Sequence, residues 1–155
     1  MRDLLIECYK IEKLAEKVYM QFADNPAYSK AVSETFMEMA TEEREHARII
    51  DMFMQTPEHE LDATPSLTKD QMDEMLRLAK GLLVCAEKSD LSANEAMKLA
   101  LQVEEQLVQA HANNALSPGS PKLTAFFADL SQYDRDHIDK LQACIDARQQ
   151  QSVTD

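Results

Sequence analysis

The segment Met39-Ala-Thr-Glu-Glu-Arg-Glu-His46-Ala-Arg-Ile-Ile50 carries a glutamate and a histidine three residues apart within a helical pattern. Residues three apart lie on one face of a helix, so Glu43 and His46 point the same way. That face is apolar, because it also carries Val32, Phe36, Met39, Ile50 and Phe53 at spacings of three and four. A carboxylate in a protein core is destabilising unless it is compensated. The segment therefore predicts that other parts of the chain compensate Glu43.

The composition favours one all-α domain. A chain of 155 residues is long enough for a sizeable core. Glycine occurs only twice and tryptophan is absent, while alanine, leucine, glutamate, glutamine and lysine, which favour helices, are common. No stretch shows the sustained two-residue alternation of a half-buried strand. We therefore expect helices and no strands.

The net charge and the cysteine content indicate which kinds of partner and which cellular compartment to expect. A net charge of −12 disfavours nucleic acid and anionic membranes as partners. No apolar run reaches the about 20 residues of a membrane span, and Glu7 interrupts the apolar stretch near the start, unlike a signal peptide. Three cysteines without a Cys-x-x-Cys pair suit a reducing compartment. We predict a cytoplasmic protein without a nucleic-acid or membrane partner.

Four long amphipathic segments and one connecting segment are predicted as helices. Capping boxes at Thr68-x-x-Gln71 and Ser92-x-x-Glu95 mark two helix starts, and Asn25 followed by Pro26 marks a third. A proline-rich turn is predicted at 117–121. The long helices are expected at 3–22, 26–55, 92–116 and 121–148, with the connecting helix at about 68–88.

The connecting helix determines the topology that we predict. About 20 helical residues span about 30 Å, enough to carry the chain back along a whole bundle. The segments 26–55 and 92–116 would then run parallel. The predicted domain is a bundle of residues 1–148, followed by a frayed tail at 149–155.

The chain contains an internal repeat. Phe36-Met39-Glu43-His46-Ile50 matches Phe127-Leu130-Asp134-His137-Leu141 position by position. In the other two long segments, Glu12 is followed seven residues later by Tyr19, and Glu104 seven residues later by His111. The repeat thus predicts that the chain forms two similar helical hairpins. If they pack about a pseudo-two-fold axis, six polar residues converge: Glu12, Glu43, His46, Glu104, Asp134 and His137.

These six residues predict a two-metal site. Four carboxylates in one core repel each other unless protons or cations intervene, and two divalent cations would balance their charge. Each histidine would give one cation a nitrogen, and a nitrogen–oxygen ligand set without thiolate suits iron or manganese better than structural zinc. One glutamate from each of two helices and Glu-x-x-His from each of the others form the site of ferritin-like di-metal bundles. We predict two iron ions, with manganese as the alternative.

Over residues 3–145 the sequence resembles the rubrerythrin-like branch of the ferritin-like superfamily. The run from Ala40 to Ala47 looks like its second-helix motif, and Glu12 with Tyr19 and Glu104 with His111 look like its first- and third-helix motifs. The resemblance implies a ferritin-like four-helix bundle with a helical crossover between the second and third helices. It also implies reaction with peroxide or dioxygen in oxidative stress, and a homodimer. Because the sequence lacks the cysteine pairs of a rubredoxin domain, a separate electron donor such as a rubredoxin-type protein is expected.

Three residues depart from the pattern of that branch. Asp134 replaces a glutamate, which shortens this carboxylate by one methylene group. His111 replaces a tyrosine, and Leu107 occupies the position of an extra carboxylate that in rubrerythrins takes part in a redox-linked shift of one iron. Asp134 is thus either a direct metal ligand or an acid that contacts a ligand without binding the metal itself. The extra carboxylate of the rubrerythrin peroxidase site is missing.

Three functions are compatible with these residues. The leading hypothesis is an oxidoreductase whose di-iron site reduces peroxide or oxidises ferrous iron. An iron-binding or iron-handling protein without turnover is favoured by the shortened Asp134, and a di-iron oxygenase with an organic substrate is the third possibility. We expect Tyr19 and His111 to contact carboxylates across the site, and a seventh metal ligand is the alternative role for His111. Glu42, Glu45 and Glu105 flank the ligands and are predicted to face solvent.

Overall fold

The chain folds into α-helices in the computed structural model, which describes residues 1–61, 64–88, 90–116 and 120–154. No strand occurs among these residues, which confirms the all-α prediction. The helices are α1 (Arg2–Ala23), α2 (Lys30–Met54), α3 (Lys69–Glu87), α4 (Ala93–Ala115) and α5 (Pro121–Thr154), with a short 3-10 helix, η1, at Glu58–Glu60.

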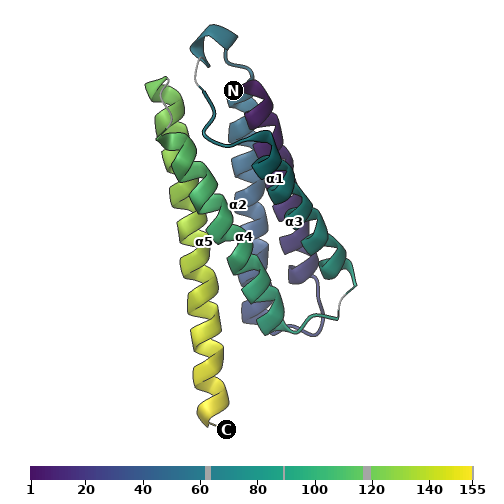
Figure 1. Cartoon of the computed structure of the whole chain (residues 1–155). Coiled ribbons are helices and arrows are strands. Elements are labelled where there is room, and N and C mark those ends of the chain that lie inside the picture. The colour runs from purple at the N-terminus through teal and green to yellow at the C-terminus, as the bar shows by residue number, and fades with distance from the viewer. Residues whose placement is uncertain (62–63, 89, 117–119, 155) are drawn as a thin grey trace.

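The helices form two antiparallel hairpins joined by a crossover helix (Figure 1). α1 packs closely on α2, and α4 packs closely on α5, while α2 meets α5 along a looser seam. α3 lies along α1 and returns the chain to the far end of the bundle, so α2 and α4 run in the same direction (Figure 1). The predicted ferritin-like bundle with a helical crossover is confirmed.

Local sequence signals explain where two helices begin. Thr68 at the start of α3 and Ser92 at the start of α4 both form complete capping boxes with the residue three positions later. The hydroxyl oxygen accepts from the backbone N–H of that residue, whose side chain in turn accepts from the backbone N–H of the cap. Each box satisfies N–H groups that a helix start would otherwise leave unpaired. Both predicted starts are confirmed.

Two predicted boundaries were wrong. α2 begins at Lys30 and not at Pro26. The backbone N–H of Tyr28 donates to the carbonyl oxygen of Asn25 at 3.1 Å, and the Oδ1 of Asn25 accepts from the N–H of Ala27, so residues 25–28 form a turn before the helix starts. α5 continues to Thr154, where a frayed tail was predicted after residue 148, since its glutamines are good helix formers. The predicted turn at 117–121 falls mainly on residues 117–119, outside the described residues.

The apolar core surrounds a layer of buried polar side chains. On α1, buried Leu5 and Cys8 precede Glu12, and buried Tyr19 and Phe22 follow it. The largest fully buried side chains come from all four bundle helices, and they include Phe36, Met39, Ile50, Met97, Leu107, Phe127, Leu130 and Leu141. Apolar side chains therefore enclose the polar layer on both sides.

No helix among the described residues is long and apolar enough to cross a membrane.

Candidate metal centre

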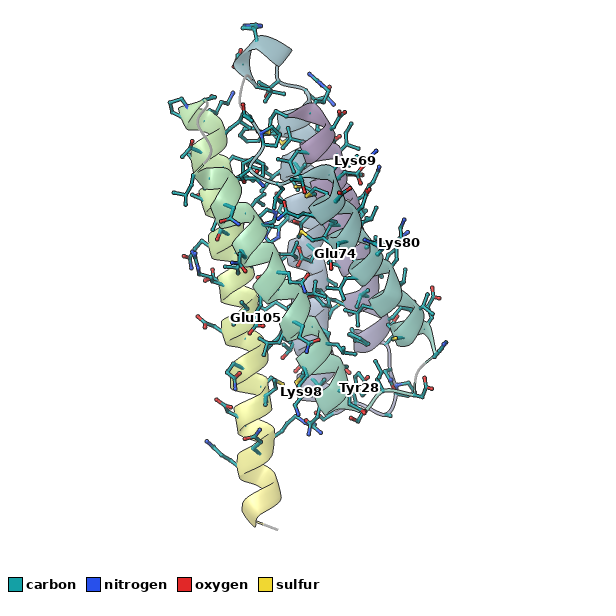
Figure 2. The ribbon with its side chains drawn as sticks, in the orientation of Figure 1. Tyr28, Lys69, Glu74, Lys80, Lys98 and Glu105 are labelled. Atoms are coloured by element: carbon teal, nitrogen blue, oxygen red, sulfur yellow. The ribbon has the colours of Figure 1, made fainter. Side chains whose placement is uncertain are left out.

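All eight residues predicted for the site lie in the polar layer of the bundle. None of them is more than 5% exposed: Glu12, Tyr19, Glu43, His46, Glu104, His111, Asp134 and His137. They come from α1, α2, α4 and α5, so the hairpin packing brings them together from distant parts of the chain. Glu105, the neighbour of Glu104 on α4, is instead exposed, as predicted (Figure 2).

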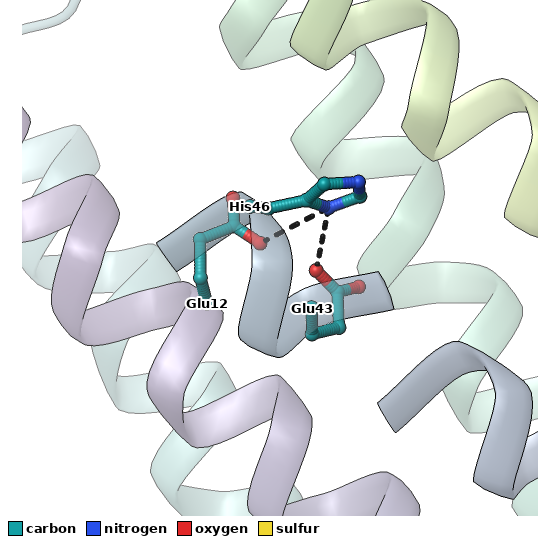
Figure 3. Close-up of side chains that lie close together, drawn as sticks. All are labelled: Glu12, Glu43 and His46. Atoms are coloured by element: carbon teal, nitrogen blue, oxygen red, sulfur yellow. Dashed lines mark hydrogen bonds and ion pairs between the residues drawn. The ribbon is translucent and has the colours of Figure 1, made fainter. Parts of the chain in front are cut away.

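Glu12, Glu43 and His46 form the first group of side chains able to hold a metal ion. One ligand atom from each lies within 4.8 Å of the others. The Nδ1 of His46 is 3.0 Å from Oε2 of Glu43 and 3.8 Å from Oε2 of Glu12 (Figure 3). α1 thus supplies one carboxylate, and one turn of α2 supplies a carboxylate and an imidazole.

Glu43, Glu104 and His137 form the second group, again within 4.8 Å of one another. The Nδ1 of His137 lies 3.1 Å from Oε1 of Glu43 and 3.4 Å from Oε2 of Glu104. Glu43 therefore belongs to both groups, with one oxygen facing each histidine. Glu43 could therefore help to hold an ion at either group.

Asp134 lies outside both groups. Its Oδ2 is 2.7 Å from Nδ1 of His111, whose Nε2 is 3.9 Å from Oε1 of Glu12. His111 therefore lies between the carboxylates of Asp134 and Glu12. The direct ligation of a metal by Asp134 stays a prediction.

Several buried polar atoms in this layer have no hydrogen-bond partner among the described residues. They are both carboxylate oxygens of Glu12, Oε1 of Glu43, Oε2 of Glu104, Oδ1 of Asp134 and Nδ1 of His137. Buried polar atoms without a partner are rare in native proteins, because each one lacks the hydration that it loses on folding. Five of these atoms are oxygens and one is an imidazole nitrogen, which are the ligand atoms that iron and manganese bind. The residues present therefore fit a pair of divalent cations.

The family model described as Rubrerythrin matches residues 3–145. The chain belongs to the rubrerythrin family. The match covers the two hairpins and the crossover helix, and with them every residue of the two groups. Among the curated proteins and the solved structures, none matches this chain. Rubrerythrins are di-iron proteins of the ferritin-like superfamily, which agrees with the ligand types that the polar layer offers.

Protons balance part of the negative charge of this rubrerythrin centre. Burial, together with the charge of Glu43, raises the pKa of Glu12 well above its usual value. The same two causes raise the pKa of Glu104 to about 7. Burial opposes ionisation of Glu43 as well, but Glu12, His137 and His46 hold its pKa well below its usual value. Glu43 is therefore held ionised, and a metal ion bound here would compete with protons on Glu12 and Glu104.

His111 and His137 are charged partners of these carboxylates. Although burial opposes it, the neighbouring Asp134 raises the pKa of His111 to about 10. Contacts with Glu104, Glu42 and Glu43 likewise raise the pKa of His137 against the effect of burial. Tyr19, whose hydroxyl donates to Oε1 of Glu104, is fully buried, and burial raises its pKa well above the usual value.

Glu42 contacts the centre, although it was predicted to face solvent. Its side chain is 38% exposed, and its Oε2 lies 2.9 Å from Nε2 of His137. Lys140 donates to both oxygens of Glu42 at 2.6 Å. The sequence contains a weak signal for this contact, since Lys140 follows His137 by three residues on one helix face. Glu42 thus orients the imidazole of His137 from the side opposite to the centre.

We expect Glu42→Gln to weaken metal binding about tenfold, because carboxylates that orient ligating histidines contribute this much to affinity. Glu38→Gln is the matched control, since Glu38 contacts Lys140 at 3.0 Å but has no contact with His137. Metal affinity would be measured for both variants by competition with a coloured chelator. Equal affinities in the two variants would contradict the role of Glu42.

Proposed function

We propose that this protein is a di-iron redox protein whose centre reacts with peroxide or dioxygen. The observation that carries the proposal is the layer of buried oxygen and nitrogen atoms without hydrogen-bond partners, arranged as two groups that share Glu43. One iron would be held by Glu12, Glu43 and His46, and the other by Glu43, Glu104 and His137. Manganese is the alternative metal, because it binds the same ligand atoms.

The chemistry follows from the residues around the two ion positions. When bound, two ferrous ions supply two electrons, one from each metal. The shared carboxylate of Glu43 keeps the two positions adjacent, while Tyr19 and Glu42 orient Glu104 and His137. Reduction of hydrogen peroxide to two waters also consumes two protons. His111 holds a proton between Asp134 and Glu12, which places a proton donor beside the ligands.

The partners in the proposal follow from the same chemistry. Each turnover needs two electrons from outside, and the sequence contains no Cys-x-x-Cys pair to hold a rubredoxin iron. We therefore propose a separate donor, such as a rubredoxin-type protein. All three cysteines are free, which suits a reducing cytoplasm. A homodimer completes the proposal by resemblance to the family.

The test is oxidation of the iron-loaded protein. Protein loaded with ferrous iron without oxygen would be mixed with hydrogen peroxide or with dioxygen and followed by absorbance. Rapid oxidation by peroxide alone is expected for a peroxidase, and oxidation of many irons per chain is expected for a ferroxidase. His46→Ala should abolish both signals. Absence of bound iron in the wild-type protein would refute the proposal.

An iron-handling protein without turnover is the second candidate. It is favoured by the position of Asp134, which contacts His111 and lies outside both groups. With Asp134 apart, three carboxylates instead of four would hold the two ions, which would favour reversible binding over a rapid change of oxidation state. Two bound ferrous ions that neither peroxide nor dioxygen oxidises would establish this function instead.

A further inference from the structure

A pocket of about 460 Å³ lies at the seam between α2 and α5. We call it the α2–α5 pocket. It is lined by both histidines of the two metal-binding groups, His46 and His137, and by Ile49 and Tyr133. Exposed Glu45 and Asp136 also line it, so it opens on the molecular surface. Three other cavities in the described part of the chain, beside Leu4, Phe126 and Gln109, are lined by no residue of either group.

Tyr133 covers one histidine of the centre from the pocket side. Its ring stacks on the imidazole of His46, with a distance of 4.8 Å between ring centroids and an angle of 12° between the planes. The tyrosine is 39% exposed, whereas His46 is only 5% exposed. No hydrogen bond of its hydroxyl is found among the described residues. Tyr133 therefore lies between solvent and His46, and its stacking on the imidazole is its contact with the centre.

Tyr133 also has space to move. It lines a second cavity of about 360 Å³ that continues along the same seam, beside Phe53 and Phe126. Ile49 lines both cavities as well. The ring thus stands at the boundary between the two cavities. The second cavity is the space into which the ring would turn to uncover His46.

The charge around the α2–α5 pocket favours a cation. The carboxylates of Glu42, Glu45 and Asp136 line it, and they outnumber its two cationic side chains, Lys140 and His137. Lys140 is already paired with Glu42 at 2.6 Å. A concave surface with excess negative charge concentrates cations from solution.

We propose that the α2–α5 pocket is the entrance by which divalent metal ions reach the buried centre, and that Tyr133 is its gate. The inference rests on the proposed metal centre. The ligands are almost completely buried, so an ion must pass a side chain that can move aside. Tyr133 lies over a ligand, is partly exposed and borders an empty cavity, whereas the carboxylate ligands are enclosed by the bundle.

The test compares the rates of Co²⁺ uptake and of Co²⁺ removal by EDTA, both followed by the visible absorption of the bound ion. Tyr133→Ala should speed both rates roughly two- to tenfold, the range that corresponds to loss of one aromatic pair. Tyr133→Phe keeps the ring and should behave as the wild type. Tyr133→Trp enlarges the ring and should slow both rates. Tyr9→Ala is the control, a tyrosine on α1 outside the pocket.

The possible outcomes distinguish a failure of the proposed gate from a failure of the proposed metal centre. A gate changes uptake and removal equally and leaves the dissociation constant and the number of bound ions unchanged. Wild-type rates in both Tyr133→Ala and Tyr133→Trp would overturn the entrance while leaving the centre intact. A changed dissociation constant with an unchanged uptake rate would show that Tyr133 only positions His46, and would also overturn the gate. If the wild-type protein binds no Co²⁺, Fe²⁺ or Mn²⁺, the proposed centre fails and the entrance fails with it.

Discussion

Glu43→Gln is expected to reduce the metal content from two ions per chain to one or none. Each oxygen of Glu43 faces one histidine, at 3.0 Å for His46 and 3.1 Å for His137, so both positions depend on this side chain. Glutamine keeps the shape but removes the negative charge and replaces one ligand oxygen with an N–H₂ group. The stabilisation by metal, about 2.7 kcal/mol at a free concentration 100 times the dissociation constant, should be largely lost. Metal analysis and thermal unfolding with and without Fe²⁺ would measure both effects.

The matched control is Glu45→Gln. Glu45 lies two residues further along α2, is exposed, and pairs with Arg48. Its replacement removes the same charge from the same helix, yet it should leave two ions bound. Asp134→Asn adds a second comparison, since Asp134 lies outside both groups and its replacement should spare at least one ion. Two bound ions in the Glu43→Gln protein would contradict the shared role of this residue.

Raising the pH from about 5 to 9 is expected to destabilise the protein in the presence of a chelator. The pKa of Glu104 is raised from 4.5 to about 7, so the folded state binds this proton more tightly than the unfolded state. The contribution of protonated Glu104 to the free energy of unfolding is complete below pH 4.5 and is lost as the pH rises through about 7. For His111 the pKa is raised from 6.5 to about 10, and its contribution is lost over that higher range. Ionisation of Glu104 alone should lower the free energy of unfolding by on the order of 3 kcal/mol.

Urea unfolding at pH 5, 7 and 9 would measure this dependence. With EDTA, the midpoint should fall at each step, whereas with saturating Mn²⁺ the fall should disappear because the cations replace the protons. Glu104→Gln is neutral at every pH, so this variant should lose the part of the slope between pH 5 and 7. A midpoint that rises between pH 5 and 7 in EDTA would show that Glu104 is not held protonated by burial.

Much of the fold follows from local patterns in the sequence. The spacing of Phe36, Met39, Glu43, His46 and Ile50 specifies one buried helix face, because the geometry of a helix is the same wherever it lies. The capping boxes specify two helix starts, since they involve residues only three positions apart. The repeat of this spacing in α5 is enough to predict two hairpins and a shared polar layer. Carboxylates at buried positions indicated cations, because charge in a core has to be compensated.

Only the tertiary structure decided which side chains meet across the helices. The pairing of Asp134 with His111, the contact of Glu42 with His137 and the stacking of Tyr133 on His46 each join two different helices. These contacts depend on how far each helix is rotated and how closely it approaches its neighbour. The periodicity of a single helix contains neither quantity. The sequence by itself therefore determined which polar residues share the buried helix faces, while packing decided that Glu43 belongs to both groups, that Asp134 lies apart from them and that a pocket opens at the α2–α5 seam.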